Sequence, residues 1–310
     1  GANVAKSLHV GHLRSANIGE ALKRLCNYLG YETISDTHLG DWGRPLGLVI
    51  LELYKRNPDW LYFDENYNGE YPDVLIHTFA YQYSRKTPSA VVPDKNVIVR
   101  LCNIECSWSN SILELANKNP NCESAHFYSD LLNWSKITNR LYIWDYSVNF
   151  RNYLLPFLNL EVLEKNINLY KKTNVKGVLM QGNFSHGGGG YLDELKSYVT
   201  ARLLRDDAKP LKELIEEFCI GYYGEDSHKE IVEYIYLWER HVKDYDLWLY
   251  DDADAPMFND EIIELSFKLL NKALSVATSD IYINRIKKLL LGMEYLHLVR
   301  LDLNYPNRDL

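Results

Sequence analysis

The sequence has no run of about 18 apolar residues, so no transmembrane helix and no membrane partner are expected. Its five cysteines are an odd number without the spacing of a disulfide framework, which favours a reducing, cytoplasmic compartment. Positive charge is also scarce, because 34 Lys and Arg residues face 42 Asp and Glu residues and leave a net charge of −8. Nucleic-acid phosphates are bound mainly by Lys and Arg, so this balance argues against such a surface.

Aromatic residues are abundant instead. They make up 13% of the 310 residues, with 24 Tyr and 7 Trp. Tyrosine and tryptophan combine a large flat face with a polar edge, which suits sugar-binding clefts and interfaces. The alternative is a core rich in tyrosine, and composition alone favours that alternative.

The first part of the chain reads as a piece of an α/β fold. Ile18, Leu22, Leu25 and Leu29 recur at helical spacing and predict a helix over 13–29. A short strand over 31–36, a glycine-punctuated loop over 38–43 and a second helix over 46–56 follow. Open α/β sheets bind ligands at the carboxyl ends of their strands, where this loop falls.

The second part alternates strands and helices. Strand-like runs at 73–81, 96–104, 140–146 and 176–184, with helices at 124–138 and 161–172, predict a parallel sheet. Four such units would form half of a β/α barrel of the TIM type. A helical region follows, with helices predicted at 191–205, 210–220, 227–248, 258–278 and 280–301. The overall prediction is an α/β chain of three parts: 1–72, 73–190 and 191–310.

A histidine box, "HVGH", opens the first predicted helix. His9 and His12 lie one turn apart around Gly11, with Lys6 close by. A helix N-terminus attracts anions through its free N–H groups, and a glycine lets a ligand approach the backbone. The design suits ATP phosphates; the alternative is a pair of surface histidines at a helix start.

The residues around this box carry a resemblance. "NVAKSLHVGHLRSANIGEALKRLCNYLGYETISDTHLGDWG" closely resembles the start of the catalytic domain of bacterial arginyl-tRNA synthetases of class I, over residues 2 to about 72. The resemblance implies a truncated, Rossmann-like nucleotide-binding piece whose partners are ATP, with Mg, and arginine. The parent family also binds tRNA, which we do not expect here. The implied ATP and arginine contacts are Asn3, Lys6, His9, Gly11, His12, His38, Gly40 and Asp41.

The same segment departs from that family. Ser7 stands where the family usually has Pro, and Arg44-Pro45 stands where a Gln commonly follows the loop. The Lys-Met-Ser-Lys-Ser loop of the class is absent from the 310 residues, as is a recognisable anticodon-binding domain. A β-strand is also expected to precede Gly1. We therefore predict that this chain does not aminoacylate tRNA.

Residues 73 to about 305 resemble a different family. "DVLIHTFAYQYSRK", "NVIVRLCNIECS" and "GVLMQGNFSHGGGGYLDELKSYVTARLL" are similar to an uncharacterised bacterial domain found in carbohydrate-active proteins. That domain resembles the barrel of α-glucuronidase-type glycoside hydrolases, which implies a glycan partner and no cofactor. The family usually has a Glu before "QG" in its last strand, and Met180 replaces it here.

The strand ends supply candidate catalytic and binding residues. Glu105 follows the strand at 96–104 and Asp145 ends the strand at 140–146, where β/α barrels place their active sites. Glycoside hydrolysis needs two carboxyl groups, so Glu105 is predicted as the acid and Asp145 as the base. The alternative is that both are structural. The aromatic residues predicted to stack on sugar faces are Tyr81, Tyr83, Trp108 and Trp144.

Other motifs are weaker. Glycines at 187–190 resemble a phosphate cradle, but no Lys-Ser/Thr follows, so a flexible loop over the barrel mouth is favoured. The acidic run at 250–256 is predicted to be a solvated turn. A zinc site is an alternative to buried thiols, yet the spacing departs from C-x2-C and no metal is expected. Its ligands would be Cys102, Cys106, Cys122 and His126.

The two resemblances meet at 69–73, where both families can share Tyr71-Pro72. We interpret the chain as a chimera joined at this short shared sequence, whether by recombination or in a misassembled reading frame. Such a join would leave sheet edges exposed in both parts. Two alternatives remain: a glycosidase-like or glycan-binding protein of unknown substrate, and a non-enzymatic helical interaction protein.

Overall fold

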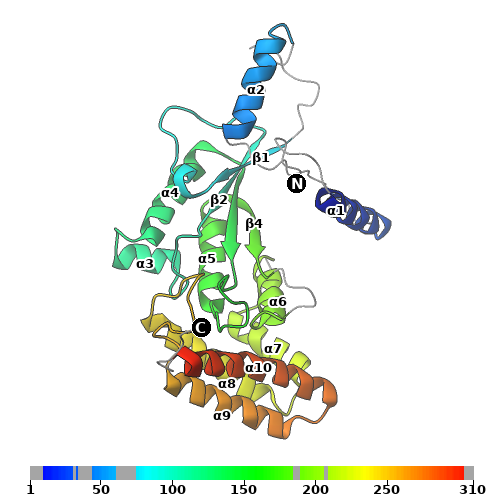
Figure 1. Cartoon of the computed structure of the whole chain (residues 1–310), viewed down its shortest axis with the longest axis vertical. Helices are drawn as coiled ribbons and strands as arrows, with labels where there is room; N and C mark the ends of the chain where they lie inside the picture. Colours follow the sequence, from blue (N-terminus) through cyan, green and yellow to red (C-terminus); the bar gives the residue numbers. More distant parts are fainter. Residues whose placement is uncertain are drawn as a thin grey trace.

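The computed structural model describes residues 10–30, 33, 44–60, 75–183, 189–205 and 209–303. Within these ranges the chain is a mixed α/β protein whose elements follow the predicted order (Figure 1). The predicted junction at 69–73 and all but Thr33 of the predicted strand at 31–36 lie outside the described residues. The described helices are α1 (Val10–Tyr28), α2 (Arg44–Arg56), α3 (Ile112–Lys118), α4 (Glu123–Ile137), α5 (Leu160–Lys172), α6 (Asp193–Leu203), α7 (Leu211–Tyr223), α8 (His228–His241), α9 (Asp260–Val276) and α10 (Asp280–Leu303).

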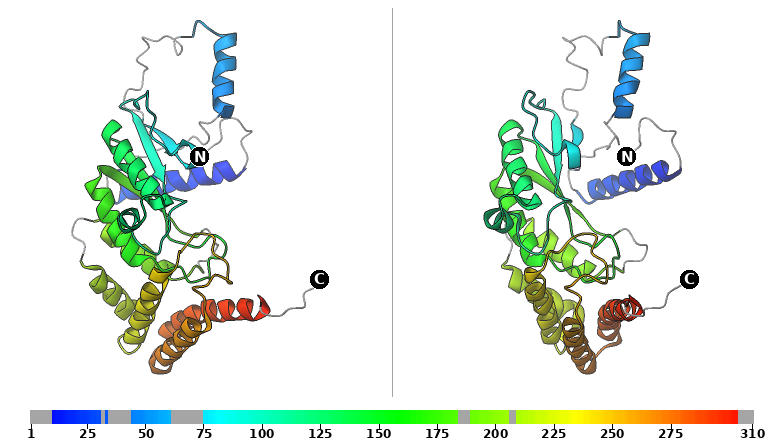
Figure 2. Two further views of the ribbon diagram at one scale, coloured as in Figure 1. Left: turned by 90° about the vertical axis from the view of Figure 1, so that its left-hand side faces the viewer. Right: turned by 60° about the vertical axis from the view of Figure 1, so that its left-hand side comes forward.

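Four parallel strands form the sheet, in the order β1-β2-β3-β4. Each strand therefore pairs with the next one along the chain. Right-handed crossovers between strands in this order place their helices on one face, and Figure 2 shows the green helices α4 and α5 on the same side of the strands. The predicted parallel sheet is confirmed, whereas its reading as half of a TIM-type barrel stays a prediction. The strands are β1 (Ile76–Ala80), β2 (Val97–Cys102), β3 (Leu141–Tyr146) and β4 (Val175–Gln181).

The two faces of the sheet differ in burial. On β3, Leu141 and Ile143 are fully buried toward the helices, while Tyr142 and Trp144, which alternate with them, are only half-buried. Phe79 on the edge strand β1 is 44% exposed. Parallel sheets are usually covered on both faces, so this second face, which we call the open face, is unusual. It is also where a ligand has access to the strands.

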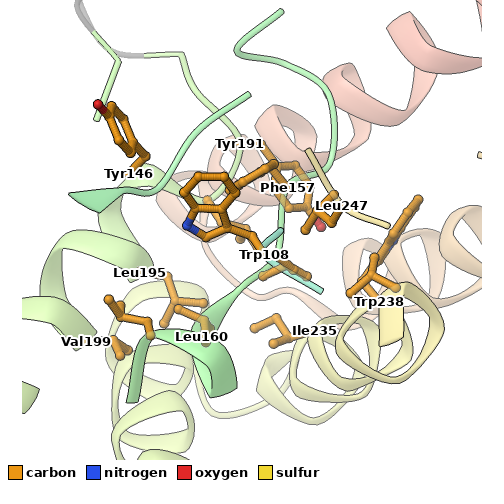
Figure 3. Close-up of a cluster of buried hydrophobic side chains, with 14 of the residues drawn as sticks. Trp108, Tyr146, Phe157, Leu160, Tyr191, Leu195, Val199, Ile235, Trp238 and Leu247 are labelled. Atoms are coloured by element: carbon orange, nitrogen blue, oxygen red, sulfur yellow. The ribbon is translucent and has the colours of Figure 1, made fainter. Parts of the chain in front are cut away.

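The helices from α6 onward pack against one another and against α5, which in turn contacts the sheet. The helix pairs α6–α7, α7–α8, α8–α9 and α9–α10 are in contact. One continuous cluster of buried side chains joins Ile143 of the sheet to Trp238 of α8 and Met293 of α10. Figure 3 shows Trp108 within this cluster, among side chains from several helices. The sheet and the following helices therefore share one hydrophobic core.

A buried carboxylate fastens α8 to the start of α5. Asn159, which precedes α5, provides no side-chain cap. The Glu239 side chain of α8 takes that place, accepting hydrogen bonds from the backbone N–H groups of Leu160 (2.8 Å) and Glu161 (3.3 Å). Free N–H groups at a helix start need such acceptors, and the helix dipole favours a negative one. Burial nevertheless raises the pKa of Glu239 to about 7.

Helices α1 and α2 keep their apolar residues in solvent. Ile18, Leu22 and Leu25 of α1 are each more than half exposed, and Tyr54 of α2 is 50% exposed. Figure 1 shows both helices standing away from the sheet. An amphipathic helix of a complete domain packs such a stripe against a core. Neither helix does so against the described part of this chain. None of the described helices is long and apolar enough to span a membrane.

Several boundaries differ from prediction. The first helix begins at Val10 rather than at 13, which places Gly11 and His12 in its first turn. The helix predicted over 227–248 ends at His241, and a short 3-10 turn (Val242–Asp244) follows it. The short helix α3 was not predicted at all. The loop after the 3-10 turn matters most, because it reaches the open face.

Candidate functional site

A cleft of about 830 Å³ lies at the carboxyl ends of the strands, on the open face of the sheet. Open α/β sheets bind their ligands at this end. We call this hollow the aromatic cleft, because eight of its lining residues carry aromatic rings. They are Phe79, Tyr81, Tyr83, Trp144, Tyr146, Phe150, Tyr153 and Tyr250. Its hydrogen-bonding side chains include Thr78, Ser84 and Gln181.

Trp144 forms the floor of the cleft and is held in a fixed orientation. Its indole N–H donates a hydrogen bond of 2.7 Å to the side-chain oxygen of Gln181 on the neighbouring strand. Its ring lies at 21° to that of Tyr146, with centroids 6.4 Å apart, and 5.3 Å from the ring of Phe79. The result is a half-buried flat surface that lines the cleft, and its predicted stacking on a sugar stays a prediction.

Tyr81 and Tyr83 stand at the rim of the cleft, on either side of a strained residue. Gln82 has a φ of 48°, in the left-handed region that residues other than glycine rarely adopt. Such strain tends to gather at ligand sites, where it holds side chains in position. Tyr83 is 95% exposed, while partial burial raises the pKa of Tyr81. The structure thus brings three of the four predicted stacking residues together.

The fourth, Trp108, is not at the cleft. It is 1% exposed and lies inside the hydrophobic core, as Figure 3 shows. Its backbone N–H donates to the carbonyl of Leu247, and its ring meets those of Tyr146 and Phe157. Because this side chain has no face in contact with solvent, the prediction that it stacks on a sugar is contradicted.

Asp145 lies on the helix-facing side of the sheet and is 2% exposed. Its carboxylate accepts hydrogen bonds from Asn103 (2.8 Å), from Tyr170 (2.8 Å) and from the backbone N–H of Tyr146 (2.8 Å). Trp108 adds a longer contact of 3.4 Å. Desolvation raises the pKa of Asp145 against these bonds. The side chain holds together the core and does not line the cleft.

Glu105 is tied into an ion-pair network. Its carboxylate accepts a hydrogen bond of 2.6 Å from the guanidinium of Arg85. Arg85 is 8% exposed and also bonds Glu123 (3.1 Å) and Asp130 (2.9 Å). Sequence reasoning missed this network, since its members lie 20 to 45 positions from Arg85 and share no motif. Glu105 and Asp145 therefore do not face each other across the aromatic cleft.

The alternative zinc site finds no support in the described ranges. No group of three or more His, Cys, Asp or Glu side chains among the described residues could hold a metal ion. Cys102 and Cys106 are both buried, and burial raises the pKa of the Cys102 thiol to about 12. A thiol with so high a pKa is a poor source of the thiolate that zinc requires.

Most of the residues implied for ATP and arginine fall outside the described part of the chain. Gly11 and His12 are the exceptions, in the first turn of α1. The glycine run at 187–190 is described only at its end. There the N–H of Gly190 donates to the carboxylate of Asp193 (2.9 Å), which occupies an amide that a phosphate would otherwise use. The residues outside are Asn3, Lys6, His9, His38, Gly40 and Asp41.

The sheet, its shared core and its cleft define an α/β domain with a ligand-sized hollow at the carboxyl ends of parallel strands. The chain belongs to the family described as "Domain of unknown function (DUF4838)", whose model matches residues 64–236. A second model, described as "tRNA synthetases class I (R), catalytic domain", matches residues 1–73. The two matches overlap over 64–73, so the chain has a two-part arrangement.

The N-terminal part is similar to arginine--tRNA ligases. That of Agathobacter rectalis is 62% identical over 80 residues, which is 26% of this chain and 13% of the ligase. That of Alkaliphilus oremlandii is 62% identical over 72 residues, which is 23% of this chain and 12% of the ligase. That of Francisella tularensis subsp. novicida is 54% identical over 88 residues, which is 27% of this chain and 15% of the ligase. This chain thus spans only about an eighth of such ligases. No solved structure matches it.

Proposed function

We propose that the larger part of this chain binds carbohydrate in the aromatic cleft. The observation that carries the proposal is the lining itself: eight aromatic residues, the half-buried Trp144 among them, with a few hydroxyl and amide groups between them. Sugars present apolar C–H faces bounded by hydroxyl rims. Flat aromatic surfaces with scattered hydrogen-bonding groups match that pattern.

Binding is favoured over hydrolysis. A glycosidase places two carboxyl groups on opposite sides of the scissile bond. Among the described lining residues of the cleft there is no Asp or Glu. Glu105 is the better candidate acid, since its neighbour Ile104 lines the cleft, but its partner Asp145 is buried beneath the sheet. We therefore propose that this part is a glycan-binding relative of barrel-type glycoside hydrolases. We also propose that its four strands, which pair in sequential order, correspond to half of such a barrel.

For the N-terminal part we propose a remnant of an arginine--tRNA ligase. The resemblance assigns ATP, Mg and arginine contacts to this segment, and the free N–H groups in the first turn of α1 suit a phosphate. The chain spans 13% of the Agathobacter rectalis ligase, and the exposed apolar stripe of α1 lacks the core that a nucleotide fold would supply. We propose that this part neither activates arginine nor charges tRNA.

The overlap of the two family matches at 64–73 supports a junction in that segment. The predicted join at Tyr71-Pro72 lies inside this overlap. Because this segment is short and shared, we propose that the chain arose by joining two unrelated reading frames there.

Titration calorimetry on the full chain tests the carbohydrate proposal. We would use cellotetraose, xylotetraose and mannotetraose as ligands. Binding of at least one is expected, weakened about tenfold or more in Trp144→Ala because a stacking surface is lost. Tyr83→Ala tests the rim, and Tyr28→Ala, a Tyr on α1 with 88% exposure, is its matched control. The proposal fails if no glycan binds or if Trp144→Ala binds as tightly as the parent.

A further inference from the structure

A second hollow, of about 640 Å³, adjoins the aromatic cleft. We call it the polar hollow, because hydroxyl, amide and charged side chains dominate its lining. They include Glu105, Ser107, Asn110, Lys118 and Lys243, and the indole of Trp248 also lines the hollow. Part of its charge is already neutralised within the protein: Glu105 is paired with Arg85, and Lys243 is paired with Glu161. Its other charged lining residues are Lys118, Glu123, Asp244 and Asp246, so the hollow carries no excess of positive charge.

The two hollows meet along a short ridge. Ile104 lines the aromatic cleft, and the next residue, Glu105, lines the polar hollow. Likewise, Tyr250 lines the cleft and Trp248 lines the hollow, with ring centroids 5.0 Å apart. Trp248 and Tyr250 are 47% and 41% exposed. A ligand that leaves the cleft toward the hollow would pass over these two rings.

This ridge is fixed by the segment that carries it. Leu247 and Leu249 are fully buried, while their neighbours Trp248 and Tyr250 remain exposed at a turn where the Asp251 carboxylate accepts from the N–H of Trp248 (2.7 Å). The Leu247 carbonyl accepts from the N–H of Trp108 (2.8 Å), and the Leu249 carbonyl from the N–H of Phe150 (2.6 Å). The two exposed rings are thus held in place by the core, which makes them a preformed stacking surface.

We propose that the ligand is a neutral oligosaccharide that spans both hollows. One sugar unit lies in the aromatic cleft, and the chain continues over Trp248 and Tyr250 into the polar hollow. This inference rests on the proposed carbohydrate function. A neutral sugar is favoured over a uronic acid because the described lining of the cleft includes no Arg or Lys to pair with a carboxylate, and in the polar hollow four acidic side chains outnumber Lys118 and Lys243.

The test compares ligands of different length on the full chain. Calorimetry would use glucose, cellobiose and cellotetraose, with xylose, xylobiose and xylotetraose as a second series. At least one series should gain tenfold or more in affinity from the monosaccharide to the tetrasaccharide. In Trp248→Ala this gain should fall to threefold or less, while monosaccharide affinity stays unchanged. The matched control is Trp60→Ala, since Trp60 is 45% exposed and lies before the sheet.

The outcomes separate the inference from the function it rests on. Equal affinity for the monosaccharide and tetrasaccharide overturns the spanning ligand and leaves carbohydrate binding intact. Absence of binding by every sugar overturns both. Tighter binding of glucuronic acid than of glucose overturns the neutral ligand. Trp248→Phe keeps a ring at the ridge and should restore most of the length dependence; an unchanged gain in Trp248→Ala also overturns the inference.

Discussion

Replacing Glu239 by Gln is expected to change how stability depends on pH. Burial raises the pKa of this carboxyl from 4.5 to about 7 in the folded chain. The folded state therefore binds the proton more tightly than the unfolded state. It follows that the free energy of unfolding falls as pH rises from about 4.5 to about 7 and is constant above that. At 1.36 kcal/mol for each pKa unit, the loss is about 3 kcal/mol.

Glu239→Gln removes this titration but keeps an oxygen to accept from the N–H of Leu160. Urea unfolding followed by circular dichroism between pH 4.5 and 8 measures the difference in stability between parent and variant. The free energy of unfolding of the parent, minus that of the variant, should fall by about 3 kcal/mol between pH 4.5 and pH 8. Burial also lowers the pKa of Lys196 to about 7. Because Lys196 is present in both proteins, its contribution cancels in the difference between their stabilities, apart from its coupling to Glu239.

A matched control lies on the same helix. Glu233 of α8 has a side chain 57% exposed and paired with Arg240, so Glu233→Gln should follow the parent at every pH within about 0.5 kcal/mol. Parallel stability curves for the parent and Glu239→Gln would refute the reasoning, because they would mean that the buried carboxyl keeps its ordinary pKa.

Four further outcomes are expected. Asp145→Ala should lower the free energy of unfolding by about 3 kcal/mol in urea melts, because it leaves several buried donors without an acceptor; a loss under about 1 kcal/mol would contradict the buried network. Leu22→Ala in α1 should cost less than about 0.5 kcal/mol, whereas Leu214→Ala in the core should cost about 2–5 kcal/mol, and equal losses would show that α1 packs on a core. The chain should show no arginine-dependent exchange between ATP and pyrophosphate, and a continuous DNA read across codons 60–85 should encode one frame; exchange above background or a break in that read would reject the respective proposal.

The strands were predictable because their signal is local. The ends of the four predicted strands lie within three residues of the observed ends. A strand that is buried on at least one face carries a dense apolar pattern, which the sequence shows directly. The helix α3 was missed although its start carries a capping box. There the Ser111 hydroxyl accepts from the N–H of Glu114, and the Glu114 carboxylate accepts from the N–H of Ser111. At seven residues, the helix is too short to show a period.

The site was only partly predictable, because the side of the sheet on which a residue lies depends on register. Trp144 and Asp145 are neighbours at the end of β3, so one faces the cleft and the other faces the helices. Both side chains were predicted to contact the ligand, because the sequence locates the end of the strand but does not show which residues face which side of the sheet. Trp248 and Tyr250 were overlooked, because they were read as part of a helix or of a solvated turn.

The order of the strands has a consequence for how this chain tolerates its composite sequence. Each sheet neighbour is also the next strand in the sequence, so no later strand inserts between earlier ones. No described residue before Ile76 takes part in the three strand pairings, so changing the sequence upstream breaks none of them. A foreign segment joined there meets a folding unit whose internal pairings are complete from its first strand onward. In evolutionary terms, the proposed junction lies where exchange of the upstream sequence leaves all three described strand pairings in place.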